Sequence, residues 1–305
     1  MPASLLMVAA TFLFATMGVC VKLASELYDA GEIVMYRGLV GITMLGVMSA
    51  VRGQTLRTAV PGLHLRRSLS GVIALSLWFY AIGKLPLATA MTLNYMSSVW
   101  MALFLIGGAL VAGRGRVDPR LVAAVLLGFA GVALVLRPTF DEQLLWQGIA
   151  GLASGMLSAL AYLQVASLGR SGEPEYRIVF YFSLGGACAG ALSTLVLGLG
   201  LGQPAGGLHG HGARGLALLL AVGLLATAAQ LLMTRAYSRG KTLVNACLQY
   251  LGIVFSFIYG VSLFRDPVTW WALAGMALII TAGLAATLLR AGAAHEPSPV
   301  AAKPS

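Results

Sequence analysis

The sequence predicts an all-α integral membrane protein with ten transmembrane helices, arranged as two inverted five-helix repeats. Three observations lead to this fold class. The 305 residues are 59% hydrophobic and only 10% charged, with a mean hydropathy of +0.87, whereas about 25% of the residues in a soluble domain are charged. The apolar residues fall into ten segments, most of them about 20 residues long, which is the length that crosses a bilayer. Finally, the two halves share a pattern at matching positions.

Short polar connections separate the ten predicted spans. They cover residues 4–23, 33–51, 67–83, 88–111, 120–137, 146–168, 177–200, 214–236, 242–264 and 268–289. Residues 1–138 give a first five-helix unit and residues 146–290 a second. The tail 291–305 is small, polar and proline-containing, so we expect it to be disordered. Because each unit has an odd number of spans, the second unit enters the membrane from the opposite side, which predicts a twofold axis in the membrane plane.

The lysine and arginine distribution predicts the orientation. With the N-terminus in the cytoplasm, fourteen of the 20 basic residues lie in inside loops and five in outside connections. Arg67 is counted among the inside-loop charges, and Arg37 lies within the second span. The excess of positive charge inside predicts a multi-pass protein of the bacterial inner membrane with a cytoplasmic tail and both termini cytoplasmic. Topology also accounts for the net charge of +10, so we expect no nucleic-acid partner.

Polar side chains gather in the first half of the fourth span. There Asn94–Tyr95 has a counterpart in Gln249–Tyr250 of the ninth span, at the same offset from Ala81 and Ala236. Both amides lie about seven residues into their spans, or roughly 10 Å deep at 1.5 Å per residue. In an inverted repeat the two pairs would approach one volume from opposite faces. The pattern therefore predicts a shared solute chamber, with helix–helix hydrogen bonding as the alternative role for the small hydroxyl groups nearby.

Further candidates extend this site. Trp100 and Tyr162 are too deep for an interfacial aromatic belt, which remains the interpretation for Trp78, Trp146, Trp270 and Trp271. Arg37 is a candidate to bind a substrate carboxylate or phosphate, with snorkelling to the headgroups as the alternative. The predicted substrate-binding residues are Arg37, Tyr80, Asn94, Tyr95, Trp100, Tyr162, Asn245, Gln249 and Tyr250. An aromatic lining favours a planar or amphipathic solute over a free sugar or an inorganic ion.

The sequence argues against catalysis and against a channel. All ten carboxylates and all four histidines are placed in loops or at the ends of spans, and the three cysteines lie singly in apolar segments. An intramembrane hydrolase would need a nucleophile with a base, or paired carboxylates, so we expect no enzyme, no cofactor and no metal site. The sequence contains neither the charged ring nor the carbonyl filter of a channel. The expected partners are a small-molecule solute and the lipid bilayer, and a homodimer is left open.

Several stretches carry a family resemblance. They are the segment LWFYAIGKLPLATAMTLNYMSSVWMALFLIGGAL, Tyr36-Arg37, Arg235-Ala236-Tyr237 and Leu263-Phe264-Arg265-Asp266-Pro267. With them the chain resembles the drug/metabolite transporter superfamily, in its ten-span EamA-type exporter family. The resemblance implies a secondary transporter that moves a small organic metabolite, such as an amino acid or a vitamin, by alternating access. The alternative is facilitated uptake of a vitamin such as riboflavin.

The chain departs from that family pattern in two ways. The proline that the family often has inside its fourth and ninth spans is replaced by Ser97 and Gly252. Of the glutamates that often end both spans, only Asp266 has a counterpart here, because the first repeat has Gly113-Arg114 at that place. A mechanism that needs both carboxylates is therefore not supported by this sequence.

Overall fold

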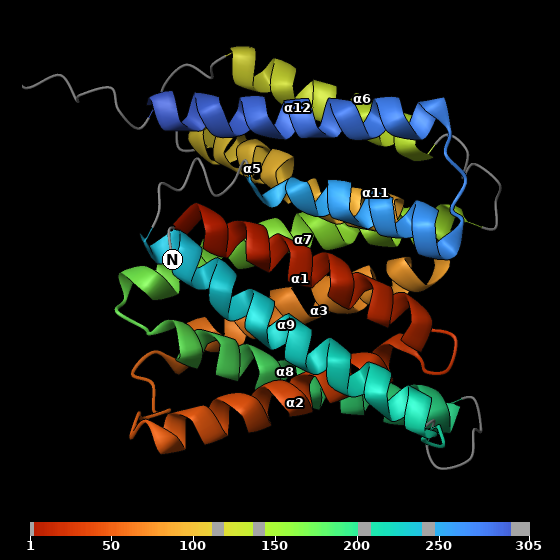
Figure 1. Ribbon diagram of the computed structural model, residues 1–305. Coiled ribbons are helices and arrows are strands. Elements are labelled where there is room, and N and C mark those ends of the chain that lie inside the picture. The colour runs from red at the N-terminus through yellow and green to blue at the C-terminus, as the bar shows by residue number, and fades with distance from the viewer. Residues whose placement is uncertain (1–2, 112–118, 137–143, 201–208, 240–247, 294–305) are drawn as a thin grey trace, which may run out of the picture.

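The computed structural model describes residues 3–111, 119–136, 144–200, 209–239 and 248–293, which form helices and contain no strand (Figure 1). This confirms the predicted all-α fold. The helices are α1 (Ala3–Ala24), α2 (Ala30–Val51), α3 (Pro61–Lys84), α4 (Leu87–Tyr95), α5 (Ser97–Val111), α6 (Pro119–Leu136), α7 (Leu145–Arg170), α8 (Glu175–Gly200), α9 (Ala213–Arg239), α11 (Leu251–Phe264) and α12 (Trp270–Ala293).

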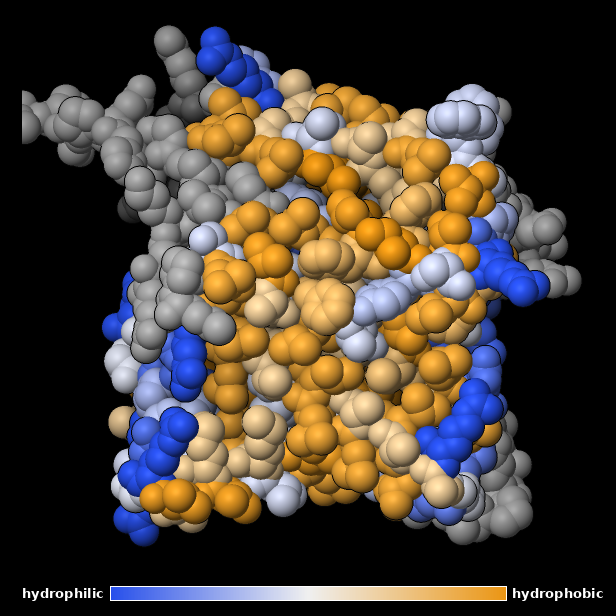
Figure 2. Space-filling model, viewed as in Figure 1, coloured by the Kyte–Doolittle hydropathy of each residue, from blue (hydrophilic) through white to orange (hydrophobic). Residues whose placement is uncertain are grey.

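The surface of the bundle suits a bilayer. Figure 2 shows a broad hydrophobic band across the helices, with hydrophilic residues gathered along two opposite edges. Large apolar side chains project from this surface, and Leu65 and Leu126 are 70% and 65% exposed. Within the described residues, five helices, α1, α2, α7, α8 and α9, are long and apolar enough to cross a membrane. Helices suit this solvent because they satisfy every backbone polar group internally.

The halves of the chain are interleaved in the bundle. The most extensive helix contacts join α2 to α8, α1 to α9, α6 to α12 and α3 to α7. Every one of these pairs combines a helix from before residue 137 with one from after residue 144. Small residues allow the approach between α2 and α8, because a Cβ at Gly38 would lie 2.4 Å from the backbone nitrogen of Ala187. The core therefore lies between the halves rather than within each of them.

Most boundaries differ from the predicted spans by a few residues, and three differences are larger or divide a span. Helix α3 begins at Pro61, six residues before the predicted third span, because proline is well suited to the first turn of a helix. The predicted fourth span is divided into α4 and α5 at Met96. Helix α12 continues to Ala293, so the predicted tail 291–305 begins inside a helix, and residues 294–305 lie outside the part that the structure describes.

Candidate substrate-binding site

The two predicted amide–tyrosine pairs lie where helices are interrupted. Helix α4 ends at Tyr95, and Val99 N then bonds to Met96 O at 2.9 Å, a tight three-residue step before the regular turns of α5. In the other half, Tyr250 forms a turn between Gln249 and the start of α11, and Ile253 N bonds to Tyr250 O at 3.0 Å. Such steps often mark functional positions in helices. The matched sequence pattern therefore coincides with a matched interruption.

The two tyrosines meet between the halves. The ring centres of Tyr95 and Tyr250 are 6.4 Å apart and the planes are tilted by 55°, within the range of favourable aromatic pairs. A glycine gives each ring its space, because a Cβ at Gly252 would overlap the Tyr95 hydroxyl and one at Gly283 would overlap the Tyr250 hydroxyl. This contact explains why glycine stands at position 252, where the family often has proline.

Asn94 is held between α4 and α7. Its side chain is buried, and Nδ2 donates to Ser154 Oγ at 3.1 Å and to Ser158 Oγ at 3.3 Å. The backbones are close here, since a Cβ at Gly155 would lie 2.6 Å from the carbonyl oxygen of Leu93. The amide is thus fixed by a helix of the second half.

A cavity of about 70 Å³ lies beside Asn94. Residues of α1, α2, α3 and α4 from the first half and of α7, α8 and α9 from the second half surround it. Its polar and aromatic lining consists of Phe14, Arg37, Arg67, Trp78, Asn94, Ser158, Tyr162, Phe182 and Gln230. A cavity between the halves, with a few polar groups among aromatic rings, has the character of a small-molecule site.

Two buried arginines face this cavity. Arg37 on α2 is 4% exposed, and its Nη2 donates to Gln230 Oε1 at 2.9 Å. Arg67 on α3 is 5% exposed. The guanidinium carbons of Arg37 and Arg67 lie 5.0 Å and 4.2 Å from the centre of the Phe182 ring on α8. Arg37 therefore lies inside the bundle, and the alternative that it snorkels to the headgroups does not describe this structure.

The other predicted site residues divide into three groups. Tyr162 lines the cavity and shares a side-chain hydrogen bond with Gln249, which brings the second amide to its edge. Trp100 packs instead against Phe104 and Phe129, with ring centres 6.3 Å and 5.0 Å away. Tyr80 is 38% exposed and is not part of the lining. Asn245 lies outside the described residues.

Sequence reasoning missed Arg67, Trp78, Phe182 and Gln230. The prediction that Arg67 is a loop charge is wrong, because the early start of α3 places it almost two turns inside a helix. The belt interpretation of Trp78 is also wrong, since its side chain is buried and lines the cavity. A usable signal was present in Arg66-Arg67, because adjacent helical residues point in different directions, so one of the two can face the bundle while the other faces outward.

Comparison with known proteins identifies the family. The model of the EamA-like transporter family matches residues 1–137. The pseudopaline exporter CntI of Pseudomonas aeruginosa strain UCBPP-PA14 is 30% identical over 94% of this chain and 96% of its own length. The chain belongs to the EamA-like transporter family. The resemblance noted in the sequence is thereby confirmed, and the protein is a membrane transporter and not an enzyme.

More distant relatives agree with this assignment. A riboflavin transporter of Rhizobium johnstonii is 27% identical to the transporter over 75% of this chain and 71% of its own length. A solved crystal structure with 21% identity superposes with a TM-score of 0.63, covering 94% of this chain and 98% of the other. At that identity the superposition supports the fold alone.

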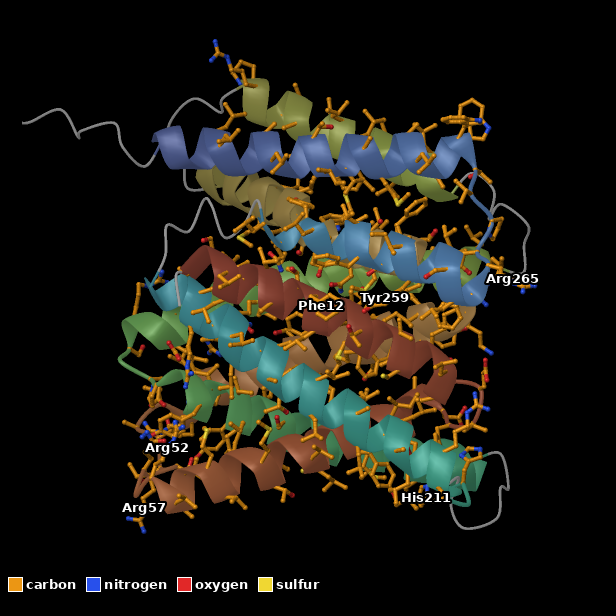
Figure 3. The ribbon with its side chains drawn as sticks, viewed as in Figure 1. Phe12, Arg52, Arg57, His211, Tyr259 and Arg265 are labelled. Carbon is orange, nitrogen blue, oxygen red and sulfur yellow. The ribbon has the colours of Figure 1, made fainter. Side chains whose placement is uncertain are left out.

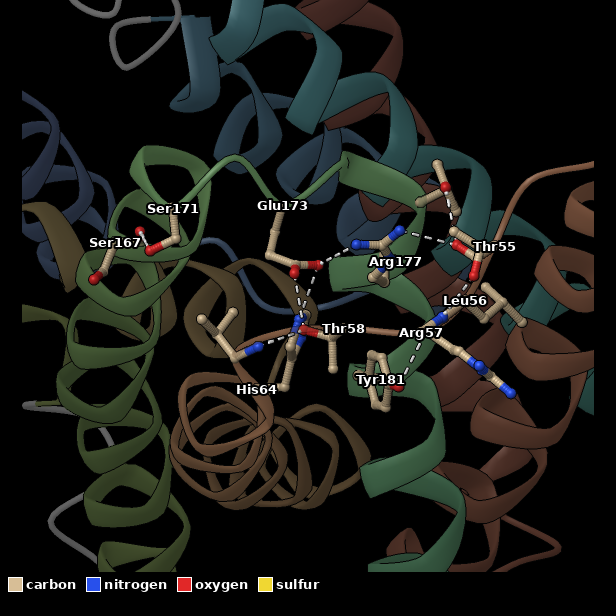
Figure 4. A network of polar contacts seen from close by, with 12 residues as sticks. Thr55, Leu56, Arg57, Thr58, His64, Ser167, Ser171, Glu173, Arg177 and Tyr181 are labelled. Atoms are coloured by element: carbon tan, nitrogen blue, oxygen red, sulfur yellow. Dashed lines mark hydrogen bonds and ion pairs between the residues drawn. The ribbon is translucent and has the colours of Figure 1, made fainter.

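A separate network of polar contacts lies at each end of the transporter. At one end Glu173, in the turn between α7 and α8, accepts from Thr58 Oγ1 at 2.8 Å and from Arg177 Nη1 at 3.1 Å (Figure 4). His64 Nε2 lies 3.2 Å from the same carboxylate. Burial opposes ionisation of Glu173, but its contacts with Thr58, Arg177 and His64 outweigh burial, so the pKa of this carboxyl lies below its usual value.

Glu173→Gln is expected to lower the melting temperature at neutral pH and to have little effect in acid. Because its folded pKa is depressed, the ionised carboxylate stabilises the protein above its unfolded pKa, and this stability is lost as the pH falls through the folded pKa. Thermal unfolding of wild type and variant across pH measures the difference. Glu26→Gln is the control, since its side chain is 61% exposed and its partner Arg214 is 3.9 Å away. A difference independent of pH would contradict this assignment.

At the opposite end Asp266 joins three segments. Leu87 N donates to Asp266 Oδ2 at 2.9 Å, and Lys22 Nζ lies 3.5 Å from Oδ1 while donating to Leu85 O at 2.9 Å. Glu32 is also fully buried, in the first turn of α2, with His209 Nδ1 at 2.8 Å from its Oε2. Glu32 and His64 lie in the first turns of α2 and α3, which agrees with the predicted placement of the carboxylates and histidines in loops and at the ends of spans.

Asp266→Ala is expected to lower the melting temperature more than Asp266→Asn. Alanine leaves the Leu87 amide without its acceptor, which costs about 1–3 kcal/mol for a buried donor, whereas the asparagine oxygen can still accept from it. Thermal unfolding of the purified protein in detergent measures both changes. Equal losses in the two variants would mean that the ion pair with Lys22, and not the bond to Leu87, stabilises this end.

Proposed function

We propose that this transporter is a secondary carrier that moves a small organic metabolite, with a planar or aromatic part, across the bacterial inner membrane by alternating access. The observation that carries the proposal is the cavity between the halves, which residues of both halves line and whose wall includes Asn94 of the Asn94–Tyr95 pair. In a carrier of this kind one repeat rocks against the other around a central site.

The helix pairing supports an inverted repeat. If α1, α2, α3, α4–α5 and α6 correspond in order to α7, α8, α9, α11 and α12, then the pairs α2–α8 and α6–α12 each map onto themselves. The pair α1–α9 maps onto α7–α3, which is packed to a similar extent. A twofold relation requires this equality, and it gives the first unit (1–138) and the second unit (146–290) equivalent roles.

The orientation has similar support. Helix α1 begins and α12 ends at the same edge of the bundle (Figure 1), and Arg52 and Arg57 lie along that edge while Arg265 lies at the other (Figure 3). We infer from the positive-inside rule that this edge is cytoplasmic. A reporter that is active only in the cytoplasm, fused to the C-terminus, is expected to be active, and an inactive fusion would reverse the orientation.

Counterflow in proteoliposomes tests the carrier mechanism. Unlabelled solute loaded inside is expected to accelerate entry of labelled solute. The reason is that the binding site of a carrier reorients across the membrane faster when it is occupied than when it is empty. A channel gives no such acceleration, so its absence would overturn the proposal. The solute is first found by screening aromatic amino acids, flavins, purines and sugars for a rise in melting temperature, since a ligand that binds only the folded state stabilises it.

Riboflavin is the second candidate substrate. The 27% identity to a riboflavin transporter and the aromatic lining favour it. Labelled riboflavin entering proteoliposomes down its gradient, without a pH gradient, would support facilitated vitamin uptake over metabolite export.

A further inference from the structure

We propose that the cavity binds a doubly charged oxyanion, either two carboxylates on one solute or a phosphate monoester, between Arg37 and Arg67. This inference rests on the proposed carrier function and names the substrate class of the same site. It starts from two buried cations on different helices, α2 and α3, that face one chamber.

The buried hydrogen-bonding atoms that have no partner among the described lining side chains of this cavity are all donors. Among the lining side chains that the structure describes, the buried polar atoms without a partner are Nε and Nη1 of Arg37, Nε and Nη1 of Arg67, and Nε1 of Trp78. All five are N–H donors. An unsatisfied buried donor costs about 1–3 kcal/mol and more when it is charged, so an occupant that accepts hydrogen bonds from these groups would stabilise the site.

The two positive charges also lack a negative partner. Arg37 bonds to the neutral Gln230, and both guanidinium groups lie over the ring of Phe182, which offsets a cation only partly. In the described part of the chain, no ion pair involves either arginine. The buried carboxylates Glu173 and Glu32 are engaged at the ends of the bundle, by Arg177 and His209. Among the described residues the two charges are therefore uncompensated, which favours an anionic occupant between them.

The size of the chamber suits the charged group rather than a whole aromatic solute. Its volume is about 70 Å³, whereas an engineered cavity that holds benzene has about 150 Å³. A carboxylate or phosphate fits this space, and guanidinium groups bind both in a bidentate manner. The two arginines indicate that the bound group carries two negative charges, because one carboxylate would leave one of the two arginines uncompensated.

Thermal unfolding of the purified full-length protein in detergent, at constant ionic strength, tests the proposal. The probes are phthalate with two carboxylates, phenyl phosphate with a doubly charged phosphate, benzoate with one charge, and benzamide with none. We expect phthalate or phenyl phosphate to raise the melting temperature in a dose-dependent way, benzoate to raise it less, and benzamide to leave it unchanged. The stronger of the first two identifies the oxyanion. Equal shifts for all four probes, or none, would overturn the proposal.

Variants assign the shift to the arginines. Arg37→Gln and Arg67→Gln are expected to abolish it, while Arg66→Gln, an exposed neighbour on the same helix, keeps it. Arg67→Lys keeps a charge without the bidentate geometry and is expected to retain a reduced shift, which serves if the glutamine variant does not fold. Without a probe, Arg67→Gln is expected to melt no lower than wild type, because an uncompensated buried charge has been removed. A shift that persists in both glutamine variants would refute the site.

The two proposals fail in different ways. If the shift depends on Arg67 but the protein shows no counterflow, the anion site stands and the carrier mechanism falls. If a neutral solute undergoes counterflow that Arg37→Gln and Arg67→Gln leave unchanged, the carrier mechanism stands and the anion site falls.

Discussion

Replacing Gly38 by alanine is expected to destabilise the transporter strongly. The new Cβ would lie 2.4 Å from Ala187 N and 2.6 Å from Ser183 O, which are backbone atoms of α8 and cannot rotate away. Overpacking of this kind typically costs about 1–3 kcal/mol of stability, and we expect the upper end of that range here because the backbone must move. The contact is reciprocal, because a Cβ at Gly190 on α8 would lie 2.4 Å from Met35 N on α2.

Gly46→Ala provides the matched control for this prediction. Gly46 lies on the same helix, but a Cβ there would meet no atom within 4 Å. Alanine favours a helix over glycine by about 1 kcal/mol, so this variant is expected to melt at the same temperature as wild type or slightly higher. Thermal unfolding in detergent, with the yield of monodisperse protein, measures both. Equal melting temperatures for the two variants would mean that α2 and α8 are not packed as described.

Asn94→Ala is expected to reduce transport by about tenfold or more while leaving the protein folded. The change removes a buried amide from the cavity wall, and a lost buried hydrogen-bonding group costs about 1–3 kcal/mol. Folding is expected to survive because Ser154 Oγ keeps its bond to Gly151 O at 2.6 Å. Gln249→Ala is expected to act in the same direction, since it removes the partner of the Tyr162 hydroxyl.

Initial rates of solute counterflow, normalised to the amount of inserted protein, measure this loss. Thr92→Ala is the control, because Thr92 is buried on the same helix and its hydroxyl bonds only to Ala88 O, at 2.6 Å. It should transport at nearly the wild-type rate. Wild-type rates in both Asn94→Ala and Gln249→Ala would remove these amides from the binding site.

Much of this arrangement follows from sequence pattern. The all-α fold was predictable because apolar segments of membrane-crossing length admit few other structures. The pairing of Asn94–Tyr95 with Gln249–Tyr250 was detectable because equal offsets in two halves are visible without coordinates. Tyr95 and Tyr250 are in contact, and this contact follows once both amide–tyrosine pairs face the same interface between the halves.

The site residues that sequence reasoning missed were missed for a different reason. Arg67 and Trp78 were assigned by their position near the end of a predicted span, whereas their environment is set by which face of α3 meets α7 and α8. A hydropathy pattern gives the length of a span but only weakly its rotation, because lipid-facing and core-facing positions are both apolar. Helix rotation comes from close contacts such as those at Gly38 and Gly155, which a single sequence does not reveal.

The interleaving of the halves has a consequence for biosynthesis. Helices α1, α2, α3 and α6 find their main partners only in α9, α8, α7 and α12, which leave the ribosome later. The first five spans therefore enter the bilayer before the surfaces they will pack against have been made, and their small-residue faces and buried arginines stay exposed to lipid or to the insertion machinery in the meantime. We therefore expect packing of this transporter to be completed only after its second half is made, and truncation after the first half is expected to yield a chain that the cell degrades.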